Sequence, residues 1–252
     1  MSIDPMDRQR ALAASEDEVR RLTGQSFDNV SPCRRDFALH IGTKKQELAI
    51  IARLSTRETE SDRVRATAEL VAHARACDDA EVAALAVATG AGGVSIQDLA
   101  AIAEATTAPV LRDDLIIHPS QLYYTRLHGA DAAVLPLADL DDAAVETLVD
   151  TAHSLDMAVI LELLGQAQVE RALRRAHVLL GLRCTDGNGT LDLEDTRRLA
   201  EQLPCHRTSV ALAEIRSAAE YNALQGVCDA VVVGEALLAG QVGSVLQAIA
   251  GR

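Results

Sequence analysis

The feature that most constrains this chain is a short apolar segment followed by a helical segment, repeated along most of the sequence. Residues 109–135 show one such unit. Val110 and Leu111 form an apolar strand, residues 119–127 read as a helix that Gly129 ends, and residues 132–135 form a second apolar strand. A strand, a helix and a strand in so few residues make a βαβ unit, and such units build parallel sheets.

The same alternation predicts eight strands along the chain. They are expected at residues 48–53, 83–88, 110–111, 132–135, 158–163, 178–182, 207–211 and 230–233. Most are continuously apolar, which is typical of strands covered on both faces. Helices are expected between them, among them one at residues 62–76 and a last one from residue 234 towards residue 249.

Eight strand–helix pairs in 252 residues predict a (β/α)8 TIM barrel, which typically takes about 250 residues. A helix at residues 4–22 lies outside the repeat, so we expect residues 1–34 to form an N-terminal helix and connector, and residues 35–252 to form the barrel. The alternative is an open, doubly wound sheet. That fold favours a glycine fingerprint after its first strand, and residues 55–58 read Ser-Thr-Arg-Glu.

Charge and cysteine content restrict the partners and the compartment. The net charge of −13 argues against nucleic acid and anionic membranes as partners, although a local basic pocket for a phosphorylated small molecule is compatible with it. The five cysteines are widely spaced and include no C-x-x-C pair, which indicates free thiols in a reducing cytoplasm and no zinc site. The sequence shows no signal peptide or membrane span. The oligomeric state stays open.

The stretch after Pro109 carries a family resemblance. It reads Pro-Val-Leu-Arg-Asp-Asp-Leu-Ile-Ile-His-Pro-Ser-Gln, and Gly-Ala-Asp and an apolar strand follow. This resembles the third strand of indole-3-glycerol phosphate synthase, which reads Pro-Val-Leu-Arg-Lys-Asp-Phe-Ile-Ile-Asp-x-x-Gln. Asp113 stands where that family has a catalytic lysine. The resemblance implies the ring closure of carboxyphenylamino-deoxyribulose phosphate in tryptophan biosynthesis, with loss of CO2 and water and with no cofactor or metal.

Other motifs of that family are partly kept. The first-strand Ala-Glu-Ile-Lys-Arg-x-Ser-Pro-Ser becomes Ala-Ile-Ile-Ala-Arg-Leu-Ser-Thr-Arg at residues 49–57, which aligns its lysine with Ala52. The fifth-strand glutamate is kept as Glu162. The sixth-strand asparagines are lost at residues 183 and 184, and residues 212–215 lack the serine and the phosphate-binding glycine of the seventh strand. The eighth-strand Val-Gly-Glu is intact at residues 233–235.

The strand ends supply the candidate site residues. We expect catalytic roles for Glu162 and Asp113, and substrate binding by Arg53, Ser55, Arg112, Arg183, Gly234 and Glu235. The expected pocket lining also includes Ala52, Ala86, Ala88 and Ala211. Gly234 and Glu235 begin a helix, where backbone N–H groups can hold phosphate.

Two interpretations of Asp113 remain open: a base or metal carboxylate paired with Glu162, or a residue in a salt bridge with Arg53 or Arg183. Loss of a general acid alone costs about 10²–10⁴-fold in rate. We therefore expect lost or much reduced synthase activity. The alternatives are a non-catalytic barrel that binds a phosphorylated metabolite or a partner protein, and an enzyme that uses Asp113 and Glu162 for another reaction. Lys44 or Lys45 beside Glu162 would overturn the lost proton donor.

Overall fold

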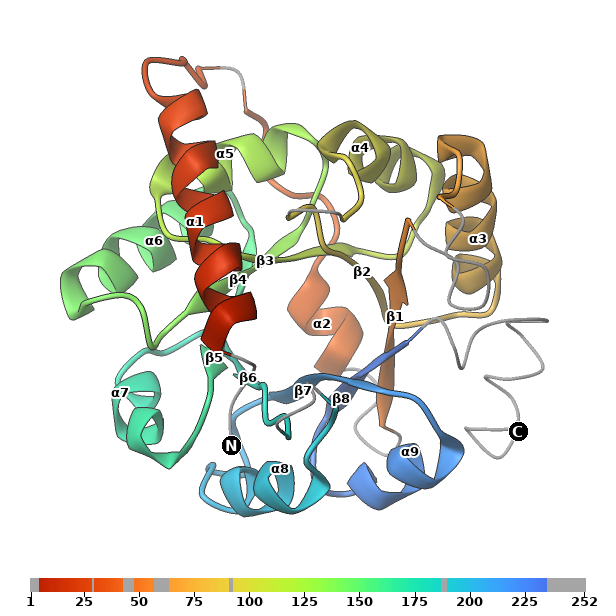
Figure 1. The fold of residues 1–252 in the computed structure, drawn as a ribbon, viewed down its shortest axis with the longest axis vertical. Coiled ribbons are helices and arrows are strands. Elements are labelled where there is room, and N and C mark those ends of the chain that lie inside the picture. Colours follow the sequence, from red (N-terminus) through yellow and green to blue (C-terminus); the bar gives the residue numbers. More distant parts are fainter. Residues whose placement is uncertain are drawn as a thin grey trace.

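The computed structural model describes residues 5–28, 30–42, 48–56, 64–90, 93–186 and 190–234. Its centre is a closed barrel of eight parallel strands in sequence order (Figure 1). The strands are β1 (Ala49–Leu54), β2 (Ala84–Val87), β3 (Val110–Leu115), β4 (Ala132–Pro136), β5 (Ala158–Leu163), β6 (Leu179–Leu182), β7 (Ser209–Ile215) and β8 (Ala230–Val233). Because β1 pairs with both β2 and β8, the predicted barrel is confirmed and the open sheet is excluded.

Helices surround the barrel, one after nearly every strand. They are α3 (Thr67–Asp79), α4 (Ile96–Ala105), α5 (Pro119–Leu127), α6 (Asp142–Ser154), η1 (Gln166–Gln168) with α7 (Val169–Leu173), α8 (Leu193–Ala200) and α9 (Ala218–Leu224). The predicted stop at Gly129 is confirmed, because α5 ends two residues earlier and Gly129 has φ +92°. The helix expected at 62–76 is instead α3 at Thr67–Asp79. The helix expected after residue 234 lies outside the described residues.

Two layers of apolar side chains, one on each face of the strands, form the core. Ile51, Leu111 and Ile160 belong to the cluster inside the barrel. Ala52 and Ala211 belong to the cluster between the strands and the helices. The prediction that Ala52 and Ala211 line the pocket is therefore wrong, because successive side chains of a strand point to opposite faces.

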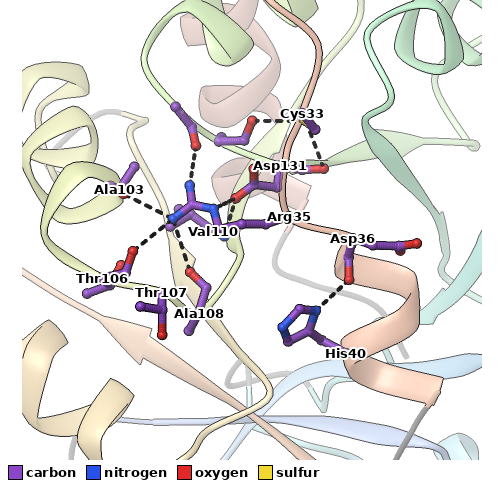
Figure 2. A network of polar contacts seen from close by, with 12 residues as sticks. Cys33, Arg35, Asp36, His40, Ala103, Thr106, Thr107, Ala108, Val110 and Asp131 are labelled. Atoms are coloured by element: carbon purple, nitrogen blue, oxygen red, sulfur yellow. Dashed lines mark hydrogen bonds and ion pairs between the residues drawn. The ribbon is translucent and has the colours of Figure 1, made fainter.

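The amino end of the barrel is closed by α2 (Phe37–Gly42), a helix that the sequence did not reveal. Phe37 and Ile41 pack in the inner cluster, with exposed fractions of 1% and 2%. Arg35, which precedes α2, donates to the carbonyl oxygens of four residues in the last turn of α4, in the α4–β3 link and after α5, and its Nε lies 2.8 Å from Asp131 Oδ2 (Figure 2). The four acceptors are Ala103, Thr106, Ala108 and Gly129. Arg35 thus holds this connector against the barrel.

The opposite end of the barrel, where the strands have their carboxyl ends, is called the mouth below. The predicted N-terminal helix is confirmed as α1 (Pro5–Leu22), and it runs in front of the β3–β5 side of the barrel in Figure 1. The buried Ser15 hydroxyl donates to the Leu115 carbonyl at 2.5 Å. Glu18 pairs with Arg112 at 2.8 Å. Within the described ranges, no helix combines the length and the apolar character that crossing a membrane requires.

Candidate functional site

Four of the predicted site residues meet at the mouth. Arg53 lies on β1, Asp113 on β3, Glu162 on β5, and Arg183 directly after β6. Each of the four lies two residues beyond a residue that faces the barrel interior. Because side chains alternate between the two faces of a strand, all four point inward. The register of β1 also means that Arg53, and not Ala52, occupies the inward position at the mouth end of that strand.

The four side chains form a continuous chain of ion pairs. Asp113 pairs with Arg53 on one side, and its Oδ1 lies 2.5 Å from Arg183 Nη2 on the other. Arg183 Nε lies 2.5 Å from Glu162 Oε1. The Asp113 and Glu162 side chains are 1% and 0% exposed. The interpretation of Asp113 as a residue in a salt bridge is therefore confirmed, since it pairs with both arginines.

A fifth charge, Arg8 of α1, extends this chain. Its Nη2 lies 2.7 Å from Glu162 Oε2 and 2.5 Å from Asp139 Oδ2. Burial by itself lowers the pKa of Arg8, but Glu162 and Asp139 outweigh it, and the net shift is upward. Arg8 thus stays charged while it covers the Glu162 carboxylate.

The pKa of Arg53 shifts downward, in contrast to that of Arg8. Burial and the neighbouring Arg183 lower its pKa to about 10, although Glu214, 3.8 Å away, opposes the shift. At neutral pH Arg53 therefore remains protonated and cannot act as a proton donor and acceptor in turn.

Arg112 has a different position from the one expected. Its guanidinium points away from the barrel axis and borders the mouth from the side. It donates to Asp114 at 2.8 Å, to Thr125 at 2.9 Å and to Glu18 at 2.8 Å. With these donors engaged, Arg112 joins β3 to α5 and α1, so substrate binding by Arg112 remains a prediction without support from this geometry.

The expected phosphate position at Gly234 is filled by another side chain. A β-carbon on Gly234 would overlap the Glu214 carboxylate, which comes from the end of β7. Glu214 stands at the position that aligns with the phosphate-binding glycine of the seventh-strand motif. A phosphate there would meet both occupied space and like charge. Glu235, the other expected anchor residue, lies outside the described residues.

Ser55 follows β1 and does not border the mouth cavity. Its carbonyl oxygen accepts a hydrogen bond from Arg65 Nη1 at 3.0 Å. The cavity at the mouth has a volume of about 750 Å³ and lies between α1 and the ends of β1, β2, β3, β5 and β6. Its polar lining includes Arg10, Asp17, Thr89 and Asp114 besides the ion-pair chain.

The chain has only two lysines, Lys44 and Lys45. Both lie outside the described residues. Whether one of them lies beside Glu162 and could serve as the proton donor therefore stays untested. Across the described ranges, no group of three or more His, Cys, Asp or Glu side chains is arranged to hold a metal ion.

Three residues that shape the mouth were not found from the sequence. Arg8 and Asp139 gave no signal, because they are 131 positions apart in the sequence and only the fold brings them together. Glu214 did give a signal in the sequence, because it replaces the glycine of the seventh-strand motif. The side chain of Glu214 is also the one that fills the space beside Gly234.

Comparison with known proteins gives a consistent family. A family model described as indole-3-glycerol phosphate synthase matches residues 6–248. The synthase of Mycolicibacterium vanbaalenii is 31% identical over 233 residues, which cover 91% of this chain and 83% of that protein. The synthase of Acidithiobacillus ferrooxidans is 39% identical over 152 residues, 59% of this chain and 58% of that protein. The synthase of Mycolicibacterium smegmatis is 36% identical over 147 residues, 57% of this chain. The aligned part is 54% of that protein, so several relatives are matched over little more than half their length.

Solved structures share the fold. The 3-hexulose-6-phosphate synthase of Salmonella typhimurium has a TM-score of 0.66 at 16% identity, over 81% of this chain and 97% of that chain. The N-acetylmannosamine-6-phosphate 2-epimerase of Clostridium perfringens has a TM-score of 0.58 at 14% identity, over 76% of this chain and 88% of that chain. At such identities the likeness concerns the barrel alone.

Proposed function

We propose that this chain, which belongs to the indole-3-glycerol phosphate synthase family of tryptophan biosynthesis, has lost the ring-closure reaction of that family. We propose that it acts instead as a non-catalytic, ligand-binding barrel. One observation carries the proposal. The residue at the position of the third-strand lysine, Asp113, is a buried carboxylate held between Arg53 and Arg183.

The chemistry explains why this substitution matters. Ring closure with loss of water needs a cationic acid that gives up a proton near neutral pH. The mouth offers only arginines as cations among the described residues that line it. An arginine keeps its proton at neutral pH, and here each one at the ion-pair chain is already paired with a carboxylate.

A repurposed enzyme that uses Asp113 and Glu162 is the second candidate, and the geometry favours it less. A general base must reach the proton that it removes within hydrogen-bonding distance. Both carboxylates are covered, and their oxygens face guanidinium groups. Such a reaction would need Arg8 or Arg183 to move first.

Binding of a phosphorylated ligand is compatible with the proposal only if Glu214 leaves Gly234. The Glu214 side chain is 24% exposed, and its ion-pair contacts to Arg53 and Arg216 are both 3.8 Å long. These contacts are loose enough for a rotamer change. A phosphorylated metabolite would then meet Arg53 and the backbone at Gly234.

Incubation of the purified full chain with carboxyphenylamino-deoxyribulose phosphate tests the proposal. We expect turnover at least about 10²-fold below that of an ordinary synthase measured alongside. Turnover within a few-fold of that synthase would refute the loss of function, and a lysine outside the described residues would then be the first candidate for the proton donor.

A further inference from the structure

Arg8 of α1 places its guanidinium group between two carboxylates of the barrel. One is Glu162 at the end of β5 and the other is Asp139, which follows β4. Besides the two Nη2 contacts given above, Arg8 Nε lies 3.1 Å from Asp139 Oδ2. The Arg8 side chain is 11% exposed. A planar guanidinium offers several N–H donors in a fixed fork, which suits a position between two carboxylates.

The fit of Arg8 in this position is incomplete. Arg8 Nη1 and Glu162 Oε2 are both buried, and neither has a hydrogen bond within the described part of the chain. Glu162 Oε2 is close to Arg8 Nη2, but the two groups are poorly aligned. A contact that is short but poorly aligned is a weaker hydrogen bond than a linear one. A guanidinium that is not tethered to α1 could rotate to align with Glu162 Oε2.

The charges around the Arg8 guanidinium favour a cation in that position. Among the described residues, Arg8 is the only ion-pair partner of Asp139, and Glu162 would keep only Arg183 if Arg8 left. The 750 Å³ cavity borders both Arg8 and Glu162. Without the Arg8 side chain, Asp139 would have no ion-pair partner among the described residues, and Glu162 would keep only Arg183, which it shares with Asp113.

We propose that Glu162 and Asp139 form a binding site for the guanidinium group of a small-molecule ligand, and that Arg8 fills this site as an internal ligand. Two further attachments of α1 near the cavity are polar: Ser15 donates to the Leu115 carbonyl, and Glu18 pairs with Arg112. Exchange of Arg8 for a free ligand leaves these two attachments of α1 in place. The inference does not depend on the loss of synthase activity, because its test measures binding and not turnover.

A titration with ethylguanidinium chloride by calorimetry, at constant ionic strength, tests the site. The variant is Arg8→Ala. The matched control is Arg20→Ala, which removes an arginine of the same helix that is 66% exposed and pairs with Asp17. Tetramethylammonium chloride serves as a cation without N–H donors. A tether holds a group at an effective concentration of about millimolar or more, so the wild type should resist the competitor.

We expect R8A to bind ethylguanidinium at least about tenfold more tightly than the wild type and R20A, and not to bind tetramethylammonium. Adding Asp139→Asn to R8A should weaken the binding again. Equal binding to the wild type and R8A, or no binding to a folded R8A, would overturn the proposal. If R8A does not fold by circular dichroism, Arg8→Gln replaces it with the same criteria.

Discussion

The Glu214 carboxylate lies over the α-carbon of Gly234, on the side where a β-carbon would project. The two residues come from the ends of β7 and β8, which are neighbouring strands of the barrel. One is the residue that replaces a phosphate-binding glycine of the family motif, and the other is the glycine of the motif that is kept. A single side chain therefore decides whether this part of the mouth is open.

We predict that Glu214→Gly allows phosphate to bind. Removing the side chain frees the space above Gly234 and removes one negative charge near Arg53. Inorganic phosphate should then raise the melting temperature of the variant progressively with phosphate concentration, and raise that of the wild type much less. Glu214→Gln keeps the volume without the charge and shows which of the two matters. A variant E214G that is insensitive to phosphate would mean that the anchor is lost for another reason.

Asp113→Lys should not restore ring closure. The new ammonium would face Arg53 and Arg183 with no carboxylate between them, so we expect a loss of about 3–5 kcal/mol in the free energy of unfolding. Urea unfolding and a turnover assay measure the two effects. Asp17→Lys reverses a charge that is 62% exposed and should change stability by less than about 1 kcal/mol. Full activity in D113K would show that the other substitutions at the mouth matter little.

Arg35→Ala should destabilise the amino end of the barrel. It leaves Asp131, 1% exposed, with Arg126 as its remaining ion-pair partner among the described residues, and it leaves four carbonyl oxygens without this donor. Removing one partner of a buried pair costs about 3–5 kcal/mol, which chemical denaturation would detect. Arg34→Ala, at the exposed neighbour, should have an effect within about 0.5 kcal/mol. A similar effect for both variants would contradict the role given to Arg35.

Stability should fall at alkaline pH. Burial raises the pKa of Cys33 and Cys184 to about 11 and that of Cys228 to about 12. A thiol of the unfolded chain ionises near pH 8.5, so the unfolded state loses protons first. The stabilising effect of these neutral thiols is complete below that pH and is lost as the pH rises through about 11.

Urea unfolding at a series of pH values measures this loss, and Cys228→Ala should make the decrease shallower. In the native protein, iodoacetamide should modify the exposed Cys205 before the buried Cys77, Cys184 and Cys228. Early labelling of Cys228 would show that the α9–β8 region opens more readily than its burial suggests.

The barrel was predictable because its strands are continuous apolar runs and its helices have recognisable ends, such as Gly129. The six-residue α2 was not, since a short apolar segment inside a connector has no clear period. The direction of side chains on β1 was also missed: aligning letters placed the lysine position at Ala52, whereas the alternation of the strand turns Arg53 inward. Arg8 was invisible because its partners are distant in sequence and only the fold brings them together.

The segment of residues 5–42 touches both openings of the barrel, with α2 at one and α1 at the other. Ribosomes make this segment before Leu115, Asp139 and Glu162, the residues to which α1 attaches. The α1 helix therefore cannot make these contacts until β5 has been synthesised, and contacts between distant parts of a chain form slowly. During translation, α1 therefore stays undocked until the strands that hold it have formed.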